Sequence, residues 1–172
     1  AGARWYSSTD LRSAYHNVPV APRDQDKTTF ICSRGMYCYN RMPFGLCNAV
    51  ATFQRLMDVV FSGLHFLSCI VYLDDIIVFS KTPEEHLERL AQVFGRLEQA
   101  KLKMKGEKCH FLQTKLSFLG HVLSAEGIGT DPEKTRAIEE WPTPTTTTQC
   151  RSFYGLASYY RRFVKDFSKT AA

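Results

Sequence analysis

The sequence predicts an α+β fold in which an antiparallel sheet is backed by helices. Three observations support this prediction. Short β-prone runs bounded by turn residues recur through the first two thirds of the chain, longer helical patterns separate them, and the last third is mostly helical. The length of 172 residues is close to that of one domain. Apolar residues make up 44% and charged residues 23%, as in ordinary globular proteins. The sequence has no stretch of eighteen apolar residues that could cross a bilayer, so no membrane partner is expected.

The expected elements begin with a strand near 4–11 and a hairpin near 28–41, whose turn is Arg34-Gly35. A helix follows over about 48–61. The apolar runs 69–73 and 76–79 form a second hairpin joined by Asp74-Asp75, and a helix is expected over about 83–100.

A further strand is expected at 116–123, with a lobe boundary near Ala125. Beyond that boundary the pattern indicates helices. Asp131 is a suitable N-cap residue and is followed by proline at the first helical position. The Thr-rich stretch 142–148 is expected to connect this helix to a last one at 148–164.

Charge and cysteine content restrict the function only broadly. The net charge of +5 suits a polyanionic partner, but such a charge is also common in proteins that bind no nucleic acid. Six cysteines without CxxC spacing favour a reduced, intracellular setting. Cys109 and His110 are adjacent, but no second pair completes the four ligands of a structural zinc site. The N-terminus shows neither an initiator Met nor a signal peptide, so we expect a piece of a longer protein.

Three aspartates carry the main chemical signal. Asp74 and Asp75 lie between the β-forming runs IVYL and IIVF. A solvated turn would explain them equally well, because Asp is a common turn residue. Asp10, however, places a third carboxylate at the end of another strand. Converging carboxylates suit Mg²⁺, and two such ions catalyse in-line displacement at phosphorus, which leaves polymerase and nuclease both open.

Five segments appear in the order typical of one family: TDLRSAYH, RMPFGLCNAVATFQRLMD, VYLDDIIVFSKTPEEHLERL, GEKCHFLQTKLSFLGHVLSAEGI and RSFYGLASYYRRF. On these motifs the chain resembles the reverse transcriptases of gypsy-type long-terminal-repeat retrotransposons over about residues 4–172. The resemblance implies a palm with partial fingers (about 19–48) in residues 1–124. It also implies the start of a thumb or connection region in 125–172.

The resemblance implies a site for two Mg²⁺ ions, with Mn²⁺ as an alternative. Asp10 and Asp74 match the residues that bind the metals, Asp75 matches a supporting acid, and the carbonyl of Leu11 would complete one coordination shell. Lys108 matches a lysine that donates a proton to the departing pyrophosphate. A solvated lysine in a basic run would explain Lys108 equally well.

The resemblance also implies substrate contacts. Tyr15 matches the aromatic residue that packs on the incoming sugar and excludes a ribose 2′-hydroxyl, although a core tyrosine is the alternative. The other implied contacts are Phe44 and Gly45 with the nucleotide and template, Gln54 on the next helix, Tyr72 beside the primer terminus, and Phe118, Leu119 and Gly120 as a primer grip.

The function implied is RNA-directed DNA polymerase, acting on an RNA or DNA template with a DNA primer and dNTPs. Ribonuclease H and integrase domains of a parent polyprotein are expected partners, in the cytoplasm and in virus-like particles.

Val50 and Gly106 stand where the family usually has proline, so two turns are expected to be less rigid. The fingers strands that clamp the triphosphate are expected upstream of Ala1. A non-catalytic remnant that retains the fold and nucleic-acid binding is therefore one alternative. A parent protein catalogued by its ribonuclease H activity is another.

Overall fold

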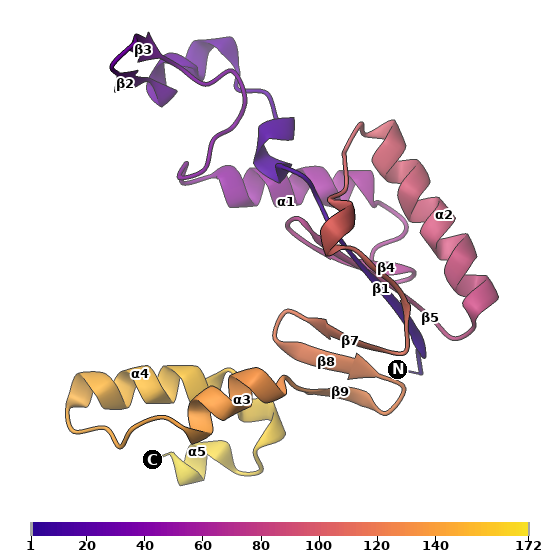
Figure 1. The fold of residues 1–172 in the computed structure, drawn as a ribbon, viewed down its shortest axis with the longest axis vertical. Coiled ribbons are helices and arrows are strands. Elements are labelled where there is room, and N and C mark those ends of the chain that lie inside the picture. Colours follow the sequence, from indigo (N-terminus) through magenta and orange to yellow (C-terminus); the bar gives the residue numbers. More distant parts are fainter. Residues whose placement is uncertain (1, 172) are drawn as a thin grey trace. The chain divides into compact units, whose positions relative to one another are not determined.

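The computed structural model describes residues 2–171 and divides into two compact units (Figure 1). The first unit spans residues 3–113, and the second runs from Thr114 toward the C-terminus and includes Gly2. The palm and thumb regions expected at 1–124 and 125–172 stay predictions. The boundary between the two compact units lies earlier, between Gln113 and Thr114. The reason is that the segment after Thr114 forms a small sheet of its own, which groups with the C-terminal helices.

The first unit is built on a four-stranded antiparallel sheet. Its strands are β1 (Trp5–Asp10), β4 (Cys69–Tyr72), β5 (Asp75–Ser80) and β6 (His110–Gln113), in the order β4-β5-β1-β6. β1 pairs with β5 along its whole length, from Trp5 opposite Ser80 to Asp10 opposite Asp75. The strands expected near 4–11, 69–73 and 76–79 are all present, whereas β6 was not expected.

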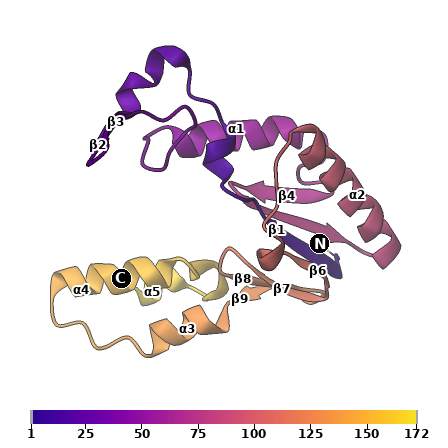
Figure 2. The ribbon, with the colours of Figure 1, turned by 45° about the horizontal axis from the view of Figure 1, so that its top comes forward.

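Helices α1 (Ala49–Val60) and α2 (Pro83–Gln99) cover the same side of this sheet (Figure 2). Phe53 and Met57 of α1 and Val93 of α2 belong to one fully buried cluster with Ile76 and Val78 of β5. Burying an aliphatic or aromatic side chain contributes roughly 1.5–3 kcal/mol, so packing in this layer stabilises the unit. Among the described residues, no helix has the length and apolar character needed to cross a membrane.

A buried polar network lies within the same layer. The ring of His86 on α2 is fully buried; its Nε2 lies 2.7 Å from Ser7 Oγ and its Nδ1 lies 2.9 Å from Ser80 Oγ. Ser80 Oγ donates to the carbonyl of Thr82, so it accepts from Nδ1–H. His86 is therefore the neutral Nδ1–H tautomer, and Ser7, which also accepts from the Leu112 amide, donates to Nε2. The network connects α2, β5, β1 and β6.

Between β1 and α1 the chain forms short elements with few buried side chains. These are three 3₁₀ helices, η1 (Ala14–Asn17), η2 (Pro22–Asp24) and η3 (Asp26–Thr28), and a hairpin of β2 (Phe30–Cys32) and β3 (Gly35–Tyr37). A fourth 3₁₀ helix, η4 (Gly106–Lys108), precedes β6. The hairpin turn is Ser33-Arg34, one residue earlier than expected, because Cys32 pairs with Gly35. All six residues of β2 and β3 are exposed.

The second unit combines a three-stranded antiparallel sheet with helices. The strands are β7 (Lys115–Phe118), β8 (His121–Ser124) and β9 (Gly127–Thr130), and the helices are α3 (Pro132–Glu139), α4 (Thr147–Ser158), η5 (Arg161–Phe163) and α5 (Phe167–Thr170). The single strand expected at 116–123 was wrong. Leu119 and Gly120 both have positive φ and form a two-residue hairpin turn. β9 occupies residues expected to lie in a helical region, and the last helix ends at Ser158, not at about 164.

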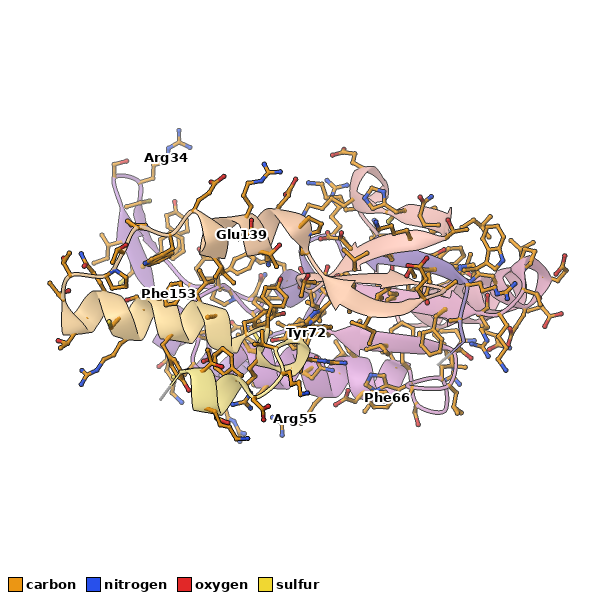
Figure 3. All side chains as sticks on the ribbon, turned by 90° about the horizontal axis from the view of Figure 1, so that it is seen from below. Arg34, Arg55, Phe66, Tyr72, Glu139 and Phe153 are labelled. Carbon is orange, nitrogen blue, oxygen red and sulfur yellow. The ribbon has the colours of Figure 1, made fainter. Side chains whose placement is uncertain are left out.

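Aromatic side chains hold this unit together. Tyr159 and Tyr160 donate hydrogen bonds to the carbonyls of Leu119 and Gly120, and the His121 ring stacks on Tyr159 at 5.4 Å between centroids. Trp141 meets Phe153 of α4, which is labelled in Figure 3 with Glu139 of α3. The residues after Ala157 thus fix the β7–β8 turn.

Candidate active site

Strand register places two of the three predicted acids together. Asp10 ends β1 and is paired with Asp75, which begins β5, and Tyr72 is paired with Asp75 from β4. Residues directly opposite in adjacent antiparallel strands project to the same face. Ile76 and Val78 project to the other face, toward α1 and α2. The carboxylates of Asp10 and Asp75 therefore lie on the face opposite to these helices, and so does the Tyr72 ring, which is labelled in Figure 3.

The third acid lies in the turn between β4 and β5. The two turn residues are Leu73 and Asp74, not Asp74 and Asp75 as expected, because Tyr72 pairs with Asp75. Leu73 has φ of 56°, a left-handed conformation that costs a non-glycine residue about 1 kcal/mol. The side chain of Gln54 on α1 accepts a hydrogen bond of 2.8 Å from the Leu73 amide. The Leu11 amide donates to the carbonyl of Asp74 at 3.1 Å, so the turn is joined to the end of β1.

A cavity of about 720 Å³ opens beside these residues. Asp10, Leu11, Tyr15, Phe44, Asp74 and Lys108 are among its lining residues, and all of them come from the first unit. The cavity therefore brings together predicted metal-binding and nucleotide-binding residues from three segments of the chain.

Lys108 contacts one of the three predicted acids in this cavity. Its Nζ lies 3.0 Å from Oδ2 of Asp10, a residue 98 positions away whose side chain is 16% exposed. The hydrogen bond and the charge of Asp10 raise the pKa of Lys108, so the side chain remains an ammonium group at neutral pH. The pKa of the Asp75 carboxyl is also raised, first by desolvation and then by the charges of Asp74 and Asp10. Asp75 is thus close enough to both other acids for their charges to act on it.

Tyr15 lines the cavity and also packs against the core. Its ring centroid lies 5.3 Å from that of Phe44 and 5.5 Å from that of buried Phe53. Both roles considered for Tyr15 are therefore compatible with its position. Gly45 follows with φ of 90°, which fits a turn that a side chain would strain.

The other predicted residues lie in different places. Gln54 uses its amide on Leu73 and on Asp58 Oδ1, and neither Gln54 nor Tyr72 lines the cavity. Phe118, Leu119 and Gly120 belong to the β7–β8 hairpin of the second unit. Their predicted role as a primer grip stays a prediction.

The chemistry of the donor set fits a divalent cation. Mg²⁺ prefers oxygen ligands, and a cation would relieve the repulsion that raises the pKa of Asp75. In the part of the chain that the structure describes, no three His, Cys, Asp or Glu side chains are already arranged as a metal site. Oδ2 of Asp10 is instead paired with Lys108. The three-carboxylate site, the Leu11 carbonyl ligand and the two ions therefore stay predictions.

Several residues that line the cavity were not predicted. They are Arg12, Ser13, Ala14, His16, Met104, Lys105, Gly106 and Glu107. Those between Arg12 and His16 directly follow Asp10 in the sequence, so their proximity to it was a usable signal. For the segment from Met104 to Glu107, the lysine-rich run around Lys108 was the corresponding signal. Near it, Cys109 Sγ donates to the carbonyl of Lys105.

Comparisons with known proteins agree with this geometry. Residues 1–123 match the family described as reverse transcriptase (RNA-dependent DNA polymerase). The Pol polyproteins of the Drosophila melanogaster transposons opus and gypsy are 42% and 40% identical to this chain, respectively. Each comparison covers 169 residues, which is 98% of the chain. The foamy viral protease-reverse transcriptase in complex with double-stranded DNA superposes with a TM-score of 0.91 at 27% identity, covering 98% of this chain and 30% of that one.

The chain spans 17% of the opus polyprotein and 16% of the gypsy polyprotein. The matched family segment contains β1, the β4–β5 hairpin and Lys108, which together form the candidate site. The chain therefore belongs to the reverse transcriptase (RNA-dependent DNA polymerase) family.

Proposed function

We propose that this chain is the catalytic core of an RNA-directed DNA polymerase encoded in a retrotransposon Pol polyprotein. The observation that carries the proposal is the pairing of Asp10 with Asp75 next to the Asp74 turn, together with the cavity that Asp10, Asp74, Tyr15 and Phe44 line. Its substrates are a DNA primer on an RNA or DNA template, and dNTPs. The complexes of the foamy viral enzyme with double-stranded DNA and with RNA/DNA hybrid support this choice of partner.

Different residues of the chain are proposed to have different roles in the reaction. Asp10, Asp74 and the carbonyl of Leu11 are the proposed ligands of two Mg²⁺ ions, or of Mn²⁺, with Asp75 as the supporting acid. When bound, such ions activate the primer 3′-hydroxyl and neutralise charge on the triphosphate. Tyr15 positions the sugar and excludes a 2′-hydroxyl, because its ring is held between Phe44 and Phe53.

Lys108 is proposed to act on the leaving pyrophosphate. Its ammonium group lines the cavity and is held near Asp10. It can therefore contact another negatively charged group that lies close to that carboxylate. Binding of a cation by Asp10 would release Lys108 from its ion pair. The released ammonium group would then donate a hydrogen bond or a proton to the pyrophosphate.

Outside the cavity, Gln54 holds the Leu73 amide and so supports the acidic turn, and Phe118 to Gly120 are proposed to contact the primer. The ribonuclease H and integrase domains of a parent polyprotein are proposed partners. The proposed location is the cytoplasm, within virus-like particles.

The test is primer extension with Mg²⁺ by a polypeptide in which this chain is joined to a reverse transcriptase fingers region. We expect Asp10→Asn and Asp74→Asn each to abolish extension, because each removes a carboxylate ligand. Glu88→Gln, which removes one exposed negative charge on α2, is the matched control and should remain active. Full extension by Asp74→Asn would contradict the proposal. An inactive parent polypeptide that still binds primer–template would favour the non-catalytic remnant.

A further inference from the structure

A second cavity, of about 770 Å³, lies in the first unit and differs in chemistry from the acidic one. Apolar side chains from three segments line part of it, including Val18, Leu56, Val59 and Leu102. A second group of lining residues is basic: His16, Arg41, Arg55 and Lys101. None of the described residues that line it is Asp or Glu.

The positive charges around this cavity are not neutralised within the chain. Among residues 2–171, the ion pairs formed by Lys and Arg side chains do not include Arg41, Arg55 or Lys101. Arg41 is oriented by a hydrogen bond of 3.0 Å from its guanidinium to the carbonyl of Asn17, which leaves its charge unpaired. Arg55 projects outward from α1 (Figure 3). Unpaired like charges around one cavity repel, and a bound anion relieves that repulsion.

The apolar lining excludes a bare inorganic ion as the best ligand. Val18 and Leu56 are half-buried, so an ion would leave the exposed part of their surfaces in water. A ligand with a ring beside its anionic group covers these surfaces and meets the cations at the same time.

The location of the cavity identifies a ligand of that kind. His16, on the 3₁₀ helix η1, lines both this cavity and the one that contains Asp10 and Asp74. We propose that the second cavity is an accessory nucleotide-binding site, in which Arg41, Arg55 and Lys101 hold the phosphate and the apolar residues pack against the base. The choice of a nucleotide among ring-bearing anions rests on the proposed function. The anion site itself does not, and without carboxylates it requires no metal ion.

The test uses methyl NMR on the 172-residue chain with dTMP as the probe and EDTA present to remove divalent metal. Binding in the second cavity should shift the methyl signals of Val18, Leu56 and Leu102. The methyls of Leu11 and Met104 line the other cavity and should shift much less. Shifts confined to Leu11 and Met104, or no shifts at millimolar dTMP, would overturn the proposal.

Charge variants test the specificity of binding. Arg55→Gln and Lys101→Gln should each weaken dTMP binding about fivefold, as expected for loss of one exposed ion pair of ~1 kcal/mol. Arg34→Gln removes the same charge from the exposed β2–β3 turn and should change nothing. Equal weakening by all three variants, or equal affinity for inorganic phosphate and dTMP, would overturn the nucleotide site. Loss of primer extension with the Val18 and Leu56 shifts intact would refute the proposed function alone.

Discussion

Replacing His86 by leucine should remove part of the acid sensitivity of the fold. Burial lowers the pKa of His86, the nearby Arg89 lowers it further, and Glu85 raises it less. Protonation would place the second hydrogen of the ring on Nε2, facing the hydroxyl proton of buried Ser7, and Ser7 already accepts from the Leu112 amide. The folded state therefore disfavours protonation of His86.

The sign follows from proton binding. An unfolded histidine has a pKa of about 6.5, whereas that of folded His86 is lower. Between these two values the unfolded chain binds the extra proton, so the free energy of unfolding falls as pH falls, by at most about 1.4 kcal/mol per pH unit. His86→Leu removes this contribution. At pH 7 the variant should be less stable by about 1–3 kcal/mol, because the Ser7 hydroxyl loses its acceptor.

The assay is urea unfolding at several values between about pH 7.5 and pH 5, comparing the original chain with His86→Leu. The difference in unfolding free energy should shrink as pH falls, since other titrating groups cancel in it. His110→Leu, at an exposed position on β6, is the control and should keep the original slope. Parallel curves for the original chain and His86→Leu would refute the assigned tautomer network.

Four further substitutions have defined expectations. Thr9→Val should raise the free energy of unfolding by up to about 1 kcal/mol in urea titrations, because the buried Thr9 hydroxyl has no hydrogen-bond partner; a loss would imply an internal water. Leu73→Gly should raise the free energy of unfolding by about 1 kcal/mol, because glycine adopts the left-handed turn without strain. Gln54→Ala should lower the free energy of unfolding by about 1 kcal/mol and speed hydrogen exchange of the Leu73 amide. Thr82→Ala should lower the free energy of unfolding by about 1 kcal/mol, and with it the melting temperature, because Thr82 caps α2 by accepting from the Glu85 amide. An unchanged melting temperature would contradict the cap.

The elements with strong periodic patterns could be predicted from the sequence, and those set by turns or distant contacts could not. α2 combines a capping threonine, Pro83 and a regular apolar stripe, and its observed bounds differ from the expected ones by one residue. The β7–β8 hairpin was missed because its apolar residues continue through Leu119, which hides the turn. β6 was missed because only pairing with β1 makes a strand of it.

The same distinction applies to the candidate site. The neighbourhood of Asp10 and the Asp74–Asp75 pair could be expected from strand ends and from the family resemblance. The ion pair between Asp10 and Lys108 joins residues 98 positions apart, and no local pattern encodes it. The second, basic cavity likewise arises from segments that are distant in sequence and was not predicted.

The turn at Leu73 has a consequence for how this hairpin can be studied. Its left-handed backbone is held by the Gln54 side chain from α1 and by the Leu11 amide through Asp74. A synthetic peptide covering only β4 and β5 would lack both contacts and would retain the intrinsic preference of leucine for negative φ. The isolated peptide should therefore populate other turn types. The geometry of the acidic turn is a property of the assembled unit, and it reports on whether α1 has docked.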